Sequence, residues 1–163
     1  MRRPLAVATA VASLVLLSAG VAAAESQTVE GTGDIDRMVA SNAQTAVTAK
    51  VFGMAPPCDT HYLWVTVNWR GADLYRAEAG CYPGGIWAKG LYYHDSADDQ
   101  NPDQVNCDGF VFRWDGERQL FKVVIPRSCL DNAPNRIRVA AEGHVYSSTT
   151  GSEAGPTTLL ARG

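Results

Sequence analysis

The chain has 163 residues and a formal net charge of −3, from 14 Lys and Arg against 17 Asp and Glu. This acidic balance argues against binding to nucleic acid or to an anionic membrane surface, because both carry negative charge themselves. The length is that of one ordinary domain, so we expect a single hydrophobic core.

Residues 1–24 are typical of a secretory signal peptide. Arg2 and Arg3 precede an apolar run over residues 5–17, and Ala22 and Ala24 satisfy the A-x-A pattern of a cleavage site. A transmembrane anchor is the alternative, but it needs about 20 strongly apolar residues and this run is broken by serines and a glycine. We therefore expect a helical signal that is removed, which leaves 139 residues with a net charge of −5 and no membrane segment.

The rest of the chain reads as β structure. Residues 25–34 are polar and contain glycine, so we expect a flexible lead-in, followed by one domain over residues 35–163. The domain shows short alternating or aromatic-rich runs separated by Gly, Pro, Asn and Asp, which predict strands. The runs cover residues 35–40, 46–52, 61–69, 74–79, 86–93, 110–114, 119–125, 136–141 and 157–160. An all-β fold, an antiparallel β-sandwich of the jelly-roll kind, accommodates this number of short strands.

The run over residues 61–69 shows the clearest alternation. Because successive side chains of a strand point to opposite faces, this run predicts one apolar face and one mixed face. The apolar face consists of Leu63, Val65, Val67 and Trp69, which we assign to the core. Tyr62 and Trp64 lie on the opposite face and are candidates for the surface.

Four cysteines in an exported domain imply two disulfides, with three possible pairings. Cys58 and Cys81 flank a predicted hairpin that turns at residues 70–73. Cys107 and Cys129 flank a second hairpin in the same way. Facing strand ends bring Cα atoms within the distance of about 7 Å that a disulfide needs, so we favour Cys58–Cys81 and Cys107–Cys129.

The loop after residue 93 is rich in carboxylates. Asp95, Asp98, Asp99 and Asp103 could supply oxygen ligands to calcium, the one cofactor that the sequence suggests. The spacing does not match an EF-hand loop, and Asp and Asn are also common in solvated turns. A weak calcium site and a plain acidic loop both remain open.

Aromatic residues form the second group of candidates. Tryptophans and tyrosines cluster between residues 62 and 114, and sugar rings stack on exposed aromatic side chains. Tyr62 and Trp64 are the candidate stacking residues because they lie opposite the core face. The alternative is that these rings fill a sandwich core, since strands favour bulky aromatic residues.

Catalytic motifs are not evident. The three histidines, His61, His94 and His144, do not show the HExxH spacing or another zinc-ligand spacing. The sequence also lacks the G-x-S-x-G pattern of a nucleophile elbow. An enzyme is therefore the weakest of the readings, and we name no catalytic residue.

One segment resembles known proteins. Residues 124–130 (VIPRSCL), followed by Pro134 and by 136–139 (RIRV), together with residues 33–35, resemble uncharacterised secreted proteins of high-GC Gram-positive bacteria. The resemblance covers most of residues 34–145. Such proteins look like distant relatives of the β-sandwich sugar- and haem-binding modules of the DOMON and family 9 carbohydrate-binding type. The resemblance implies a β-sandwich and a binding role, and it supplies no catalytic residues.

The sequence therefore predicts a secreted, non-catalytic binding module. An extracellular carbohydrate or cell-wall polymer is the first expected ligand. A structural or protein-interaction domain without a small-molecule site is the second interpretation, and a secreted hydrolase is the third.

Overall fold

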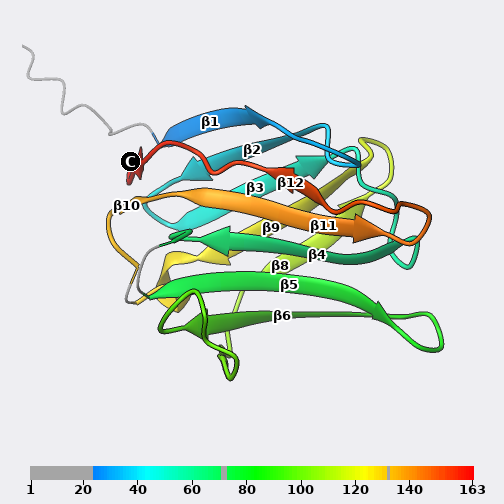
Figure 1. Cartoon of the computed structure of the whole chain (residues 1–163). Helices are drawn as coiled ribbons and strands as arrows, with labels where there is room; N and C mark the ends of the chain where they lie inside the picture. The colour runs from blue at the N-terminus through cyan, green and yellow to red at the C-terminus, as the bar shows by residue number, and fades with distance from the viewer. Residues whose placement is uncertain (1–23, 71–72, 132) are drawn as a thin grey trace, which may run out of the picture.

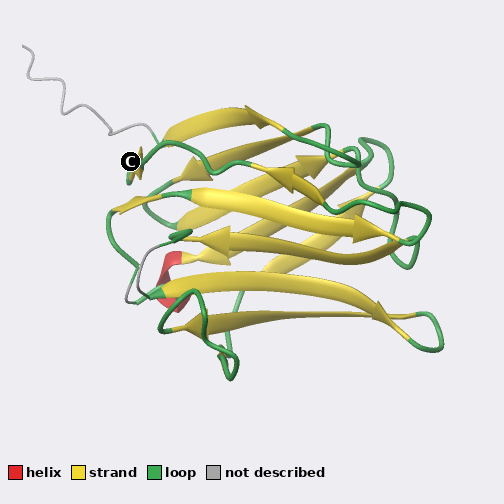
Figure 2. Cartoon of the chain, viewed as in Figure 1, coloured by secondary structure: helices red, strands yellow, loops and turns green. Residues whose placement is uncertain are grey.

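The computed structural model describes residues 24–70, 73–131 and 133–163, so the expected signal peptide lies outside the described residues apart from Ala24. Two antiparallel sheets pack face to face, with β11, β4, β5 and β6 in front of β3, β9 and β8 in Figure 1. The only helical segment in the described ranges is a short 3-10 helix, η1 (Arg127–Cys129), drawn red in Figure 2. The predicted all-β antiparallel sandwich is confirmed. No helix among the described residues is long and apolar enough to cross a membrane.

The first sheet has five strands, which pair in the order β1–β2–β3–β9–β8. Their bounds are β1 Glu25–Glu30, β2 Arg37–Asn42, β3 Ala46–Phe52, β9 Leu120–Pro126 and β8 Val111–Asp115. The second sheet has six strands, in the order β12–β11–β4–β5–β6–β7. Their bounds are β12 Ser152–Ala154, β11 Val139–Val145, β4 Thr60–Val67, β5 Leu74–Tyr82, β6 Ile86–His94 and β7 Asp103–Gln104. A two-stranded ribbon joins β10 Arg136–Ile137 to β13 Leu160–Ala161.

The prediction of a flexible lead-in was wrong for residues 25–30, which form strand β1. This strand pairs antiparallel with β2 along its whole length, from Glu25↔Asn42 to Glu30↔Arg37. Its side chains also contact the C-terminal segment, where the Thr158 amide donates a 2.7 Å hydrogen bond to Oε1 of Gln27. β2 is the next strand along the chain, but Thr158 lies 131 residues after Gln27, so the local polarity of residues 25–34 could not reveal that contact.

The inner faces of the two sheets form one core. Phe121 on β9 is fully buried in this core. Its ring stacks on that of Trp87 of β6, with ring centroids 5.6 Å apart. Phe121 also contacts the rings of Phe112 at 6.1 Å and Trp114 at 4.8 Å on the neighbouring strand β8. Aromatic side chains from both sheets therefore hold the layers together.

The expected core face of β4 is confirmed for Leu63, Val65 and Val67, each no more than 1% exposed. The assignment of Trp69 to the core was wrong. β4 ends at Val67, and Asn68 then takes a positive φ of 62°, which turns the chain out of the strand. Trp69 is partly exposed there, with the Arg70 guanidinium 4.1 Å from its ring centroid.

Both predicted disulfides are confirmed. Cys58 is bonded to Cys81 with Cα atoms 5.0 Å apart, and Cys107 to Cys129 with Cα atoms 5.6 Å apart. The first closes the open end of the β4–β5 hairpin and the second closes the β8–β9 hairpin. Each sheet thus carries one bridge, and the pair indicates an oxidising environment.

Candidate functional site

The outer face of the six-stranded sheet presents the side chains that alternate with the core residues. On β4 these are Tyr62 and Trp64, as the sequence predicts. The register places Trp64 opposite Glu78 of β5, and Glu78 opposite Gly90 of β6. Two residues along β4, on the same face, Tyr62 lies opposite Gly80, which in turn lies opposite Ala88.

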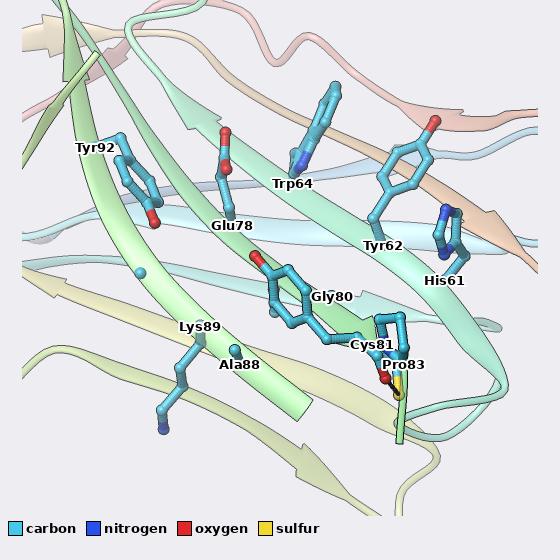
Figure 3. Close-up of a pocket in the computed structure, with 13 residues that line it drawn as sticks. His61, Tyr62, Trp64, Glu78, Gly80, Cys81, Pro83, Ala88, Lys89 and Tyr92 are labelled. Carbon is cyan, nitrogen blue, oxygen red and sulfur yellow. Dashed lines mark hydrogen bonds between the residues drawn. The ribbon is translucent and has the colours of Figure 1, made fainter. Parts of the chain in front are cut away.

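A groove of about 320 Å³ crosses β4, β5 and β6 on this outer face. We call it the β4–β6 groove, and Figure 3 shows its side chains. Its lining consists of His61, Tyr62, Trp64, Glu78, Ala79, Gly80, Cys81, Tyr82, Pro83, Ala88, Lys89, Gly90 and Tyr92. Its volume and its mixture of aromatic and a few polar groups are those of a small-ligand site.

Small residues form the floor of the β4–β6 groove. Gly80, Ala88 and Gly90 occupy adjacent outward positions of β5 and β6. A Cβ atom at Gly90 would lie only 2.7 Å from Cε2 of Tyr92, so the absence of a side chain lets the Tyr92 ring lie over the sheet. The groove exists because these outward positions carry little or no side chain.

Aromatic rings form the walls. The rings of Tyr62 and Trp64 lie 4.7 Å apart at an angle of 31°, and the ring of His144 on β11 stacks on Tyr62 with centroids 6.0 Å apart. Figure 3 shows Trp64, Glu78 and Tyr92 projecting in a row on the same side of the sheet. The Glu78 carboxylate therefore stands between two aromatic side chains.

Glu78 is the carboxylate that lines the groove, and Arg76, two residues before it on β5, is its ion-pair partner. Nη1 of Arg76 lies 3.8 Å from Oε1 of Glu78, and the two side chains are 22% and 30% exposed. Burial raises the pKa of the Glu78 carboxyl, and the Arg76 guanidinium opposes part of that shift. The Arg76 guanidinium also lies 4.9 Å from the Trp64 ring centroid, a cation–π contact.

Tyr62 and Trp64 are thus brought together in one groove, both half-buried and accessible from the outer face. Sequence reasoning missed Glu78, Gly90 and Tyr92, which line the same groove. Alternation along residues 86–93 could have placed Tyr92 and Gly90 on one face. It could not have placed them beside Trp64, because that depends on the pairing of β4, β5 and β6.

The acidic loop does not form a comparable site. Asp95, Asp98 and Asp103 are exposed, and Asp99 accepts a 2.9 Å hydrogen bond from the Asn101 amide. Across residues 24–70, 73–131 and 133–163, no group of three or more His, Cys, Asp or Glu side chains is arranged to hold a metal ion. We therefore propose no calcium site.

His94 is the one histidine of the loop region and lies buried at the end of β6, with 3% of its side chain exposed. Its Nδ1 is 4.0 Å from Oδ2 of Asp99, and both ring nitrogens lack a hydrogen-bond partner among the described residues. Burial, followed by the nearby Arg76 charge, lowers the pKa of His94, while Asp99 and Asp95 oppose the shift. His94 is thus an enclosed imidazole at the base of the loop.

Comparisons with known proteins give no further guidance: no family model, no curated protein and no solved structure matches the chain. The resemblance to secreted proteins of high-GC Gram-positive bacteria therefore stays a prediction from the sequence motif.

Proposed function

We propose that the chain is a secreted, non-catalytic module that binds carbohydrate in the β4–β6 groove. The observation that carries the proposal is the arrangement of Trp64, Tyr62 and Tyr92 around a half-buried carboxylate, Glu78. Stacked rings suit the C–H faces of a sugar, and a carboxylate accepts hydrogen bonds from its hydroxyls. The two disulfides support export, since such bonds persist in oxidising compartments.

A binding role is favoured over hydrolysis by the position of the carboxylates. Glu78 and Glu142 are the neighbours of Trp64 on either side, in β5 and β11. A glycosidase pair needs its two carboxyl groups to face the same bond of the substrate. Here the side chain of Trp64 stands between them, so the arrangement suits stacking and hydrogen bonding.

Affinity measurements with two tryptophan variants test the proposal. Residues 25–163 would be titrated with soluble glycans and cell-wall polysaccharides, as wild type, Trp64→Ala and Trp69→Ala. Truncation of an aromatic anchor costs about 2 kcal/mol, or roughly 30-fold in affinity, so Trp64→Ala should lose binding. Trp69 is also partly exposed but lies outside the groove, so Trp69→Ala is the matched control.

The proposal is wrong if no glycan binds, or if both variants keep wild-type affinity. Circular dichroism of each variant checks that the fold is retained. We expect it to be, because Trp64 lies on the outer face of the sheet and not in the core.

A protein partner is the second candidate, and it is favoured by a group of exposed apolar side chains at one end of the groove. Tyr82 and Ile86 face each other across the β5–β6 hairpin and are 61% and 64% exposed. Tyr146, 58% exposed, donates a hydrogen bond to the Cys81 carbonyl close by. Exposed apolar patches of this kind mark interaction surfaces.

A further inference from the structure

The Glu78 carboxylate has the capacity to bind a further cation. It stands in register between Trp64 and Gly90, and 30% of its side chain is exposed to the groove. Within the described part of the chain it makes one ion pair, with Arg76 at 3.8 Å, and no hydrogen bond. That separation exceeds the usual hydrogen-bond range of about 3.2 Å, so both carboxylate oxygens can still accept donors.

Of the two nearby protein cations, Arg76 is the ion-pair partner of Glu78 and also contacts Trp64, and only Lys89 is engaged elsewhere. The Arg76 guanidinium rests against the Trp64 ring at 4.9 Å. The ammonium of Lys89 donates a 2.9 Å hydrogen bond to the Phe112 carbonyl of the opposite sheet, and Figure 3 shows its side chain pointing away from Glu78. The groove therefore offers a carboxylate that has one protein cation beside it and no direct hydrogen bond from the described residues.

The surroundings of Glu78 also favour positive charge. Trp64 has a second carboxylate, Glu142, on its other side, and the faces of Trp64, Tyr62 and Tyr92 attract cations. Burial raises the pKa of Glu78 because the carboxylate loses water. A ligand cation beside it would restore that lost stabilisation.

We propose that the β4–β6 groove selects carbohydrate with free, protonated amino groups, such as a de-N-acetylated amino-sugar polymer. This inference rests on the proposed carbohydrate-binding function and names its ligand class. The pyranose ring packs against the parts of Trp64, Tyr62 and Tyr92 that line the groove, and the ammonium donates to Glu78. A hydrogen bond between two ions is about twice as strong as one between neutral groups, whereas an acetyl group removes the charge of the ligand and with it this additional bond to Glu78.

Three oligosaccharides of equal length and linkage test the inference by titration calorimetry. They are β-1,4-linked hexamers of glucosamine, of N-acetylglucosamine and of glucose. We expect wild-type residues 25–163 to bind the glucosamine hexamer about tenfold or more tightly than the other two, the range expected for a hydrogen bond to a charged group. Raising the salt concentration from 0.05 to 0.5 M should weaken binding of the glucosamine hexamer alone, because salt screens ion pairs.

Glu78→Gln and Glu142→Gln form the matched pair of variants. Both keep the size and shape of the side chain, and both sites lie on the outer face of the same sheet. Glu78→Gln should lower the affinity for the glucosamine hexamer to that for the glucose hexamer. Glu142→Gln should retain most of the preference.

The outcomes separate the two proposals. Equal affinity for all three hexamers, unchanged by salt, overturns the selection of amino groups but leaves carbohydrate binding intact. A preference that survives Glu78→Gln and disappears in Glu142→Gln overturns the role of Glu78. If none of the hexamers nor any other glycan binds, the proposed function fails and this inference fails with it.

Discussion

Gly90 and Gly143 are strand glycines on opposite faces of the six-stranded sheet, and replacing each by alanine should impair a different property of the protein. A Cβ atom at Gly90 would lie 2.7 Å from Cε2 and 2.9 Å from Oη of Tyr92, at the far end of that side chain in the groove. A Cβ atom at Gly143 would lie 2.6 Å from Cε of Met54, which is 2% exposed in the core. We expect Gly90→Ala to impair binding and Gly143→Ala to impair stability.

The magnitude for Gly90→Ala follows from two small terms. Pushing Tyr92 away from its rotamer costs about 0.5–1.5 kcal/mol. Alanine restricts the unfolded chain more than glycine does, which contributes about 0.4–1 kcal/mol to stability. The free energy of unfolding should therefore stay within about 1 kcal/mol of wild type, whereas the displaced ring should lower glycan affinity by about tenfold.

The Cβ atom added by Gly143→Ala would lie in the closely packed core. It would also lie 3.1 Å from Sδ of Met54 and 3.4 Å from Cδ1 of Leu63, and both side chains are buried. Overpacking a core costs about 1–3 kcal/mol, of which the restricted unfolded chain recovers less than 1 kcal/mol. We expect a loss of about 1–2 kcal/mol in stability with unchanged affinity of the folded fraction.

Urea unfolding followed by tryptophan fluorescence measures the stability, and calorimetry with the best glycan ligand measures the affinity. The reasoning is refuted if Gly90→Ala destabilises the protein as much as Gly143→Ala does. It is also refuted if Gly90→Ala binds as tightly as wild type, because Tyr92 would then not be part of the site.

Three further variants test the core, the disulfides and the buried histidine. Phe121→Ala should lose about 3–5 kcal/mol of stability by urea unfolding, because it removes a ring that contacts both sheets; a loss below 1 kcal/mol would contradict this assignment. Replacing Cys107 and Cys129 together by serine should lower the unfolding free energy by about 3 kcal/mol without changing the far-ultraviolet spectrum, and an unchanged urea midpoint would count against it. The pKa of His94 is lower in the folded state than in the unfolded state, so on acidification the unfolded chain binds a proton at a higher pH than the folded chain does. Thermal stability should therefore fall as the pH drops below about 6.5, the ordinary pKa of histidine. That loss should be smaller in His94→Gln, and an identical pH profile for the variant would refute the assignment.

Much of the fold could be predicted because its signals are local. Alternation over residues 61–69 identified the buried face of β4, since the side-chain period of a strand is two regardless of its partners. Both disulfides close hairpins, so the pairing followed from the positions of the cysteines around two short turns. The predicted boundary at Trp69 failed because the left-handed backbone of Asn68 ends the strand first.

Strand β1 and the candidate site could not be predicted in the same way. The pairing of residues 25–30 depends on β2 and on contacts with the C-terminal segment, which leave no pattern in a short polar stretch. The sequence could place Tyr62 and Trp64 on an outer face. It could not show that Glu78, Gly90 and Tyr92 would lie beside them.

The sequence by itself thus determined the all-β class, the inward and outward faces of its clearest strand and the disulfide pairing. The tertiary structure decided the groove. Glu78 stands between Trp64 and Tyr92 only because β4, β5 and β6 pair in one register, and Gly90 gives Tyr92 its place only within that sheet. Register is settled by the packing of a whole sheet against its core, and shifting it by one residue would turn every one of these side chains to the other face.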